Sequence, residues 1–597
     1  MDMPSAFGVI PWTQTMLCEK FSGEEFYKEN QYCIDDAPKP YGQIPNEPGK
    51  RSQNTGTSID GKHPQRGLTG QLPVPSSKRR ERSKQDFEAP SEKPAFYKVV
   101  KPFHCRFLYH ADSMTGRLLK YTSLSRIFKD AGKSNGSEKG KRPKKPTNEE
   151  RIMNEKETME YIEELKKYGS VPGLANIRNL CEKLGHPERE LSFIHIAGTN
   201  GKGSTLAFLS EILKCAGYKV GKYVSPTIFD YRERIQVNDR MISKRALAQG
   251  MTLCREICEE LVAEGQPHPT AFEIETALAF WYFREQKCKI VVLETGLGGE
   301  MDATNIVTNT LAEVFTSISL DHMGILGSSL AEIAAVKAGI MKKGSVAVTT
   351  TQDPEVMEIL KFRAEKEGIP LVEASPLQAR QVKSSLNGQT FSYEEFSKVQ
   401  ISLLGRYQIQ NAVLALETVR VLRGKTLHGH AISIPDKAVM QGMKNAVWPG
   451  RFQIVAKKPF FIADGAHNRD GAAQLAESLR YYFPQKRLIF IMGILRDKEQ
   501  EEIVKATVPL ADQVFTISTK GPRGFSAIEL AEICSRYKTG VTAADGIREA
   551  LELAYLMASQ EDVIVAFGSL SFLGELLPQV EQMTAQKAKK KGSLFNV

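Results

Sequence analysis

The segment FIHIAGTNGKGST, residues Phe193 to Thr205, decides the fold class of this chain. A short apolar strand runs into a glycine-rich loop, Gly198 to Ser204, and the loop runs into a segment whose leucines share one helical face, namely Leu206, Leu209 and Leu213. Glycines let backbone N–H groups turn inward around phosphate oxygens, and the N-terminus of the next helix adds a favourable dipole. This order of elements predicts a phosphate-binding loop at the edge of an α/β domain.

Within this loop, Lys202 is expected to neutralise the β- and γ-phosphates of a nucleotide, and Ser204 stands where its hydroxyl can approach a metal ion. The spacing departs from the usual G-x4-G-K-[ST] pattern because Gly203 separates the lysine from the serine. A glycine-rich turn without a ligand is the alternative interpretation. The strand before the loop and the helical pattern after it favour phosphate binding.

Short strands and amphipathic helices alternate outward from this segment. The first series of expected strands is Phe193–Ala197, Ile290–Leu293, Val314–Leu320 and Val346–Thr350, and the second is Phe460–Ala463, Leu488–Met492, Val514–Ile517 and Val563–Phe567. Such alternation predicts mostly parallel sheets with helices on both faces. We therefore expect a P-loop-type α/β ATPase domain over residues 153–447 and a smaller Rossmann-like α/β domain over 448–597, divided where proline and glycine interrupt the chain at Trp448–Arg451.

Polar residues follow two further strands of the first series. Glu294 ends the strand that begins at Ile290, and His322 follows the next one. Ligands of open α/β sheets bind at the carboxyl ends of the strands, and a carboxylate beside phosphates suits Mg²⁺. Glu294 alone could equally be a satisfied structural acid, and a lone histidine is more often structural. Because both share the predicted edge with Lys202, metal binding is favoured.

Lys337 lies between apolar neighbours in the helical segment EIAAVKAGI. One interpretation is a surface lysine whose ammonium group reaches water along an apolar stem. The other is a buried lysine with a lowered pKa, which can be chemically modified. The spacing alone leaves both open.

The composition of the chain limits the classes of partner that it is expected to bind. The net charge of +10 is concentrated in residues 1–150, which hold 26 Lys and Arg against 18 Asp and Glu, so residues 151–597 carry only about +2. A nucleic-acid partner is therefore not expected for the catalytic body.

No run approaches the ~18 apolar residues of a membrane span, and no secretory signal is visible. Nine scattered cysteines fit reduced thiols and a cytoplasmic location. Residues 1–152 form a basic extension, largely disordered by composition and of unknown role.

Six blocks resemble, in order, those of the folylpolyglutamate synthase/dihydrofolate synthase family of the Mur ligase superfamily: AGTNGKGST, LETGLGGEMDATN, SLDHMGILG with VKAGI, GRYQIQNA, WPGRFQ and DGAHN. The resemblance covers Met153 to about Leu577, nearly three quarters of the chain. It implies an ATP- and magnesium-dependent ligase that adds L-glutamate to the γ-carboxylate of a folate through an acyl phosphate, releasing ADP and phosphate. Whether dihydropteroate, reduced folates or both are accepted stays open, as do glutamate chain length and oligomeric state, for which we expect a monomer.

The resemblance also implies roles for individual residues. Mg²⁺ would be held by Ser225, Glu294 and His322, and a carbamylated Lys337 would help to hold a second Mg²⁺. The residues implied for ATP are Thr199, Asn200, Gly201, Lys202, Gly203, Ser204, Asn411, Arg451 and Asp464. His467 would lie near the incoming glutamate, and Thr270 and Asp302 near the pterin. The chain departs from the family at Ser225-Pro226-Thr227, where a histidine often follows the proline, which puts fine substrate contacts in doubt.

Three alternatives remain at this point. Another Mur-superfamily ligase, acting on a cell-wall precursor, would usually carry a front domain for a nucleotide sugar, which residues 1–150 do not resemble. A P-loop phosphotransferase would not require the DGAHN segment. A non-enzymatic scaffold would not need Lys202, Glu294, His322 and Lys337 together. ADP release that depends on L-glutamate separates a ligase from a kinase.

Overall fold

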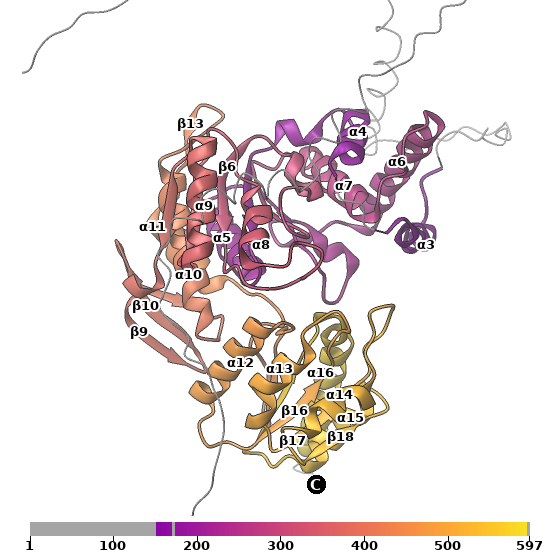
Figure 1. Cartoon of the computed structure of the whole chain (residues 1–597), viewed down its shortest axis with the longest axis vertical. Coiled ribbons are helices and arrows are strands. Elements are labelled where there is room, and N and C mark those ends of the chain that lie inside the picture. Colours follow the sequence, from indigo (N-terminus) through magenta and orange to yellow (C-terminus); the bar gives the residue numbers. More distant parts are fainter. Residues whose placement is uncertain (1–150, 170–172, 594–597) are drawn as a thin grey trace, which may run out of the picture. The chain divides into compact units, whose positions relative to one another are not determined.

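The computed structural model describes residues 151–169 and 173–593 (Figure 1). All described residues belong to one compact unit of the chain. The predicted basic extension therefore lies outside the described residues except for its last two positions. No helix among those described is long and apolar enough to cross a membrane.

The first α/β unit is built on an eight-stranded sheet with the strand order β4-β3-β2-β5-β1-β6-β7-β8. All neighbours pair in parallel except β2 with β3 and β3 with β4. The bounds are β1 Phe193–Ala197, β2 Val220–Tyr223, β3 Ile235–Val237, β4 Arg240–Met241, β5 Ile290–Glu294, β6 Thr310–Phe315, β7 Ala347–Thr350 and β8 Leu371–Ala374. The central strand β1 thus lies between β5 and β6, and all three end at the same edge.

Helices cover both faces of this sheet. Ile194 of β1 packs into a core with α5 (Lys202–Cys215), α10 (Tyr407–Arg423) and α11 (Asp436–Asn445). Its neighbour Phe193 points to the other face and packs with the following helices: α3 (Glu155–Glu164), α4 (Ala175–Lys183), α6 (Lys244–Ala263) and α7 (Ala271–Glu285). Ala197, on that same face, packs with α8 (Leu330–Ala338) and α9 (Pro354–Glu367). The alternation along β1 follows the period of two residues in a strand.

A smaller antiparallel sheet extends the first core. Its strands are β9 (Arg380–Ser385), β10 (Gly388–Tyr393) and β11 (Phe396–Ile401), and a short pair, β12 (Thr426–Leu427) and β13 (His430–Ala431), follows α10. Phe391, Tyr393 and Val399 join the core around α10. This sheet was not predicted, because strand β9 (RQVKSS) is polar and mostly exposed and gives no clear apolar alternation.

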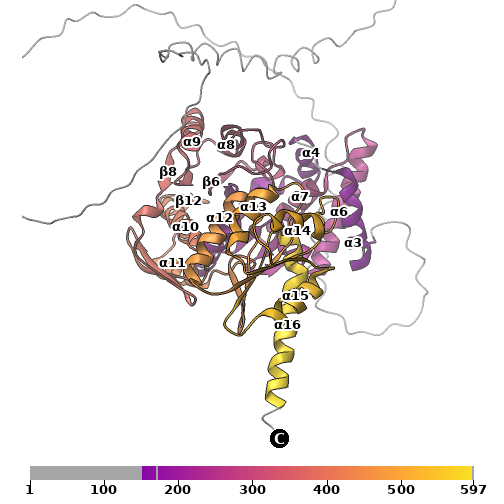
Figure 2. The same ribbon diagram turned by 60° about the horizontal axis from the view of Figure 1, so that its bottom comes forward.

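A six-stranded sheet follows residue 452 in the order β14-β15-β19-β16-β17-β18, parallel except for β14. Its strands β16, β17 and β18 are labelled in Figure 1. This sheet and the helices that pack on it form the second α/β unit. Its strands are β14 Gln453–Lys457, β15 Phe460–Ala463, β16 Leu488–Met492, β17 Gln513–Thr516, β18 Val541–Ala543 and β19 Val563–Phe567. One face packs against α12 (Arg469–Tyr482), α13 (Gln500–Thr507) and α14 (Ala527–Ser535), and the other against α15 (Ile547–Met557) and α16 (Leu570–Ser593). Helix α16 extends well past the other elements in Figure 2.

These sheets confirm the predicted fold class, a mostly parallel central sheet and a second α/β unit. The predicted strand Val314–Leu320 was wrong in its bounds, because β6 begins at Thr310 and ends at Phe315. Beyond Phe315 the chain leaves the sheet, since the carbonyl of Ser317 accepts hydrogen bonds from the backbone N–H groups of Thr199 and Asn200. The glycine-rich loop therefore pairs with the segment that follows β6.

Candidate active site

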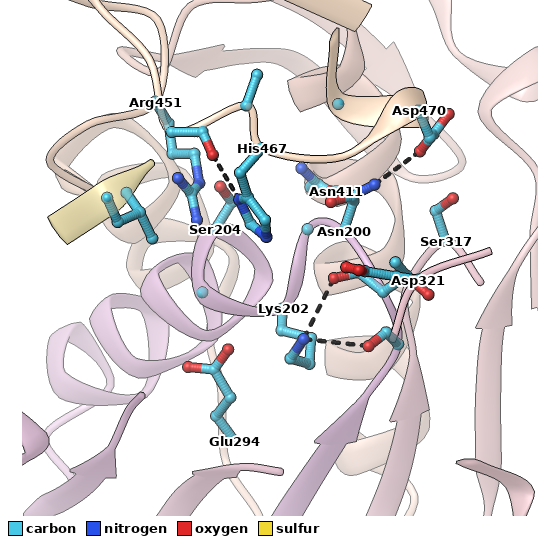
Figure 3. Close-up of a pocket in the computed structure, with 18 of the residues that line it drawn as sticks. Asn200, Lys202, Ser204, Glu294, Ser317, Asp321, Asn411, Arg451, His467 and Asp470 are labelled. Atoms are coloured by element: carbon cyan, nitrogen blue, oxygen red, sulfur yellow. Dashed lines mark hydrogen bonds between the residues drawn. The ribbon is translucent and has the colours of Figure 1, made fainter. Parts of the chain in front are cut away.

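A pocket at the carboxyl edge of the first sheet gathers most of the predicted site residues (Figure 3). It also draws side chains from the second α/β unit. The predicted residues that line it are Thr199, Asn200, Gly201, Lys202, Gly203, Ser204, Ser225, Glu294, His322, Lys337, Asn411, Arg451, Asp464 and His467. The sequence prediction that strand ends meet at one point is confirmed by this geometry.

Two glycines of the loop have no room for a side chain. Gly201, the N-cap of α5, has φ of +94°, and a methyl group there would lie 2.3 Å from Oδ1 of Asn411. A methyl group on Gly203 would lie 2.6 Å from the indole of Trp448. Gly203, which makes the loop depart from the usual spacing, thus lets Trp448 pack directly on the start of α5.

Lys202 is the first residue of α5, and its side chain folds back over the loop. Its ammonium group donates hydrogen bonds to the carbonyls of Gly198 at 3.1 Å and Thr199 at 3.2 Å (Figure 3). Burial lowers the pKa of Lys202, and the nearby Glu294 carboxylate opposes that shift. The carboxylate of Glu294 influences this ammonium group only from a distance, and a bound phosphate group would supply an anionic partner in direct contact.

Glu294 ends β5 as a buried carboxylate. Its Oε2 accepts a hydrogen bond from the backbone N–H of Ser225 at 3.3 Å. Burial raises the pKa of Glu294 to about 7, although the Lys202 ammonium favours the ionised form. A carboxylate this poorly solvated requires a cation to remain ionised at neutral pH.

His322 lies in the loop after β6 with φ of +53°, a left-handed conformation that histidine seldom adopts. Its Nε2 lies 3.5 Å from the ammonium group of Lys498. Burial lowers the pKa of His322, and the charge of Lys498 lowers it further. The imidazole is therefore held neutral, the form in which a nitrogen lone pair can bind a metal ion.

Lys337, in α8, is buried, which excludes a lysine that reaches bulk water. Its ammonium group donates to the carbonyl of Gly198 at 3.0 Å. Burial lowers the pKa of Lys337 to about 7, and the charge of Lys202 adds to this effect. Two lysines thus converge on one backbone carbonyl, and Lys337 is substantially unprotonated at neutral pH.

Ser204 and Asn411 are connected through Gln408 of α10. Gln408 donates from Nε2 to the hydroxyl of Ser204 at 3.1 Å, and its Oε1 accepts from Nδ2 of Asn411 at 3.0 Å. The amide oxygen of Asn411 faces the loop at Gly201. Helix α10 therefore positions both the loop and the asparagine that the sequence assigned to the nucleotide.

Asp464 follows β15 and fixes the start of the second α/β unit. Its carboxylate accepts from the backbone N–H groups of Phe452 at 2.7 Å and Ala466 at 2.8 Å, and from the hydroxyl of Tyr407 at 3.0 Å. Burial raises the pKa of Asp464. Arg451 donates to the carbonyl of Gly450 at 3.2 Å, and its guanidinium group lies against Gly465.

His467 is oriented by a hydrogen bond between its Nδ1 and the carbonyl of Gly465 at 2.7 Å (Figure 3). Since a carbonyl can only accept, Nδ1 carries the proton and Nε2 keeps its lone pair. Burial lowers the pKa of His467 to about 4, and the charge of Lys498 contributes. The ring is neutral at pH 7 and can accept a proton or hydrogen bond at Nε2.

Thr270 and Asp302 do not line this pocket. Thr270 is the N-cap of α7 and exchanges hydrogen bonds with Glu273 in a capping box. Asp302 caps a short 3-10 helix and accepts from the backbone N–H of Leu297 at 2.7 Å. The structure gives both residues local roles, and their contact with a substrate stays a prediction.

No group of three or more His, Cys, Asp or Glu side chains gathers to hold a metal within residues 151–169 and 173–593. The predicted metal ligands contain only two residues of these types, Glu294 and His322. The buried carboxylate of Glu294, with a backbone N–H of Ser225 as its hydrogen-bond donor, is the kind of hard oxygen ligand that Mg²⁺ accepts. These donors fit a magnesium ion completed by phosphate oxygens and water.

Sequence reasoning missed Asp470, which lines the pocket, and Asn468 and Lys498, which contact Asp321 of its lining. Asn200 donates to Asp470 at 2.9 Å, and Asn468 donates to Asp321 at 2.9 Å (Figure 3 for Asn200 and Asp470). Lys498 lies behind them, paired with Asp321. Lys498 lies in the loop between β16 and α13, well beyond the end of β16, so the strand-end argument does not single it out.

Comparison with known proteins identifies the family. The Mur ligase middle domain matches residues 196–419, and the Mur ligase glutamate ligase domain matches residues 450–570. A dihydrofolate synthase/folylpolyglutamate synthase from Bacillus subtilis is 34% identical over 419 residues, which cover 69% of this chain and 95% of that protein. This chain belongs to the folylpolyglutamate synthase/dihydrofolate synthase family. A dihydrofolate synthetase of Saccharomyces cerevisiae is 31% identical over 68% of this chain and 97% of its own length.

Solved structures agree with this membership in the folylpolyglutamate synthase/dihydrofolate synthase family. A folylpolyglutamate synthase of Mycobacterium tuberculosis, complexed with ADP and AMPPCP, has a TM-score of 0.65 at 28% identity and covers 72% of this chain and 99% of its own. An Escherichia coli protein in complex with DHPP and ADP has a TM-score of 0.62 at 28% identity and covers 72% and 98%.

Proposed function

We propose that this ligase adds L-glutamate to the γ-carboxylate of a folate, with ATP as the source of the activating phosphate. One observation carries the proposal. A single pocket brings the lysine of a phosphate loop, the buried carboxylate of Glu294 and the neutral imidazole of His467 to one point. The names of the relatives, folylpolyglutamate synthase and dihydrofolate synthase, supply the folate and the glutamate.

The chemistry explains why such a pocket is needed. A carboxylate does not condense with an amine in water, because its oxygen is a poor leaving group. Transfer of the γ-phosphate to the substrate carboxylate gives an acyl phosphate, the amine of glutamate attacks its carbonyl carbon, and phosphate leaves. Lys202 and Arg451 offset the repulsion between phosphate and carboxylate and stabilise the charge of the transition state. Since water would hydrolyse the acyl phosphate, the second α/β unit excludes it from the pocket.

Magnesium, when bound, supplies further charge neutralisation at the phosphates. Ser225, Glu294 and His322 are the residues that would hold it. We propose that the unprotonated amine of Lys337 adds to the carbon of carbon dioxide and loses a proton to solvent, which gives a carbamate, because burial lowers the pKa of this lysine to about 7 beside the loop. A carbamate turns a cation that repels a metal into an anionic oxygen ligand, which would help to hold a second magnesium ion.

The remaining residues orient the substrates. Thr199, Asn200, Gly201, Gly203 and Ser204 surround the phosphates in this proposal, and Asn411 and Asp464 contact the nucleotide. His467 accepts a proton or hydrogen bond from the incoming glutamate at Nε2. Thr270 and Asp302 stabilise the wall near the pterin. We also propose that the protein is a cytoplasmic monomer with an ATP-binding domain over 153–447 and a glutamate-ligase domain over 448–597.

ADP release is the direct test of this function. We expect a mixture of protein, ATP, Mg²⁺ and tetrahydrofolate to release ADP rapidly only after L-glutamate is added, because the acyl phosphate is otherwise not consumed. Dihydropteroate is assayed side by side to decide which acceptor is used. Equal ADP release with and without glutamate would indicate a kinase or ATPase instead. No release with either acceptor would overturn the assignment of the substrate.

Residues 1–152 are expected to contribute nothing to catalysis, because the described residues that line the pocket, from Gly198 to Leu570, already include the predicted ligands of ATP and of the metal. A chain that begins at Met153 should therefore keep kcat and KM within about twofold of the full chain. Steady-state ADP release of both proteins measures this. A loss of an order of magnitude in kcat, with thermal stability unchanged, would show that the extension takes part in the reaction.

A further inference from the structure

A buried ion pair joins the two α/β units beside the pocket. Lys498 lies between β16 and α13, and Asp321 lies in the loop after β6. The ammonium nitrogen and Oδ1 are 2.6 Å apart, and the side chains are only 5% and 9% exposed. Another contact between the units, Arg406 with Glu477, has side chains about half exposed, at 52% and 49%. Exposed pairs of that kind contribute little, whereas a buried charge depends strongly on its partner.

Asp321 receives hydrogen bonds on both of its oxygens. Oδ1 accepts from Lys498 and from the backbone N–H of His322 at 2.9 Å. Oδ2 accepts from Nδ2 of Asn468 at 2.9 Å, and Asn468 is also the N-cap of α12. Both side-chain donors to Asp321 that are described here thus come from the second α/β unit. The carboxylate of Asp321 belongs to the first unit but is held by the second.

Asp321, whose carboxylate is held in this way, directly precedes His322 in the chain. The backbone N–H of His322 donates to Asp321, and the residue has φ of +53°, a conformation that persists only where the surroundings impose it. Its Nε2 lies 3.5 Å from the ammonium group of Lys498. Asp321 thus holds the backbone from which the imidazole of His322 projects.

We propose that Lys498 and Asp321 form a latch that docks the second α/β unit on the loop after β6 and so positions His322 in the pocket. The inference rests on the proposed function, in which His322 is a ligand of the magnesium ion. Lys498 and Asp321 are positioning residues: they act through His322 and the docking of the units. Residues that orient a metal ligand typically change activity by about 10- to 100-fold when they are replaced.

A double-mutant cycle in the full-length protein tests the latch. The variants are Asp321→Asn, Lys498→Met and both together, with Lys505→Met as the matched control. Lys505 belongs to α13, close to Lys498 in sequence, but it is 63% exposed and pairs with Glu502 at 4.0 Å. The readouts are kcat and KM for ADP release, the Kd for ADP, and hydrogen exchange of residues 316–329 in protein without ligand or metal.

Each single variant is expected to lower kcat by about 10- to 100-fold, with the Kd for ADP within about threefold of wild type. The kcat of the double variant should be no lower than that of the slower single variant, because both substitutions break the same interaction between Lys498 and Asp321. Exchange of residues 316–329 should be faster in every latch variant and unchanged in Lys505→Met. If a single variant fails to fold, the double variant, which leaves no buried charge unpaired, carries the same expectations for kcat and exchange.

Two results would overturn the latch. Losses that multiply in the double variant would show that Lys498 and Asp321 act independently, for example with Lys498 on the substrate. Wild-type exchange of residues 316–329 in the latch variants would show that the pair does not hold this loop. The proposed function fails separately, if the wild-type protein releases no ADP with a folate and glutamate, and hydrogen exchange still decides the latch in that case.

Discussion

Replacing Lys202 by alanine is expected to lower glutamate-dependent ADP release by about 10³-fold or more, while the protein stays folded. The side chain of Lys202 is half-buried, and among the described residues its ammonium group finds its hydrogen-bond acceptors in two carbonyls of its own loop, Gly198 at 3.1 Å and Thr199 at 3.2 Å. A bound triphosphate would offer it anionic oxygens in place of these carbonyls. Without the ammonium group of Lys202, the negative charge that develops during phosphoryl transfer loses a cation that neutralises it.

The control for this substitution is Lys219→Ala. Lys219 follows the same helix but is exposed, so its loss should leave kcat unchanged. Circular dichroism and thermal unfolding of both variants separate a folding defect from a chemical one. Turnover of Lys202→Ala near the wild-type rate would refute the role assigned to the lysine, and with it the phosphate loop.

Replacing Lys337 by alanine is expected to lower kcat by about 10²-fold or more, and short-chain carboxylates should restore part of the rate. The reason is the proposed carbamate: alanine removes an anionic oxygen ligand, and formate or acetate can diffuse into the space and replace it. The pKa of Lys337, lowered to about 7 by burial, leaves the amine able to react with carbon dioxide at neutral pH.

Carbon-13 NMR of protein equilibrated with labelled bicarbonate measures the modification itself. A carbamate signal should be present in the wild-type protein and absent from Lys337→Ala. Since the unprotonated amine is the reactive form, the signal should grow as pH rises through about 7. An unmodified lysine in fully active protein, or a variant that no carboxylate rescues, would count against the carbamate.

Local sequence patterns predicted those parallel strands that are short buried apolar runs between helices. They missed the parallel strands β2 (VGKY), β8 (LVEA) and β18 (VTA), in which polar or charged residues or a glycine interrupt the apolar run. They also failed where a strand is exposed or where contacts far apart in sequence decide its end. Strand β9 is exposed and polar, and the apolar residues after Phe315 continue a strand pattern although the chain has left the sheet to pair with the glycine-rich loop. That pairing depends on contacts far apart in sequence, which no local pattern contains.

The site was predictable for the same reason that the sheet was. Glu294 ends one parallel strand and His322 follows another, and such strands end at one edge, so the order of elements alone predicted that both side chains lie at this pocket. Their electrostatic states were not, since the raised pKa of Glu294 and the lowered pKa of His322 depend on burial. Lys498 was missed because its partner Asp321 belongs to the other α/β unit, and docking between units leaves no periodic signal in a sequence.

A crystal structure of the protein with a non-hydrolysable ATP analogue, Mg²⁺ and a folate tests the central arrangement most directly. The expected result is a divalent ion beside the terminal phosphate with Glu294 and His322 among its ligands and the ammonium group of Lys202 on the phosphate oxygens. An ion bound elsewhere, with Glu294 and His322 turned away from the phosphates, would contradict the assignment of this pocket as the ligase site.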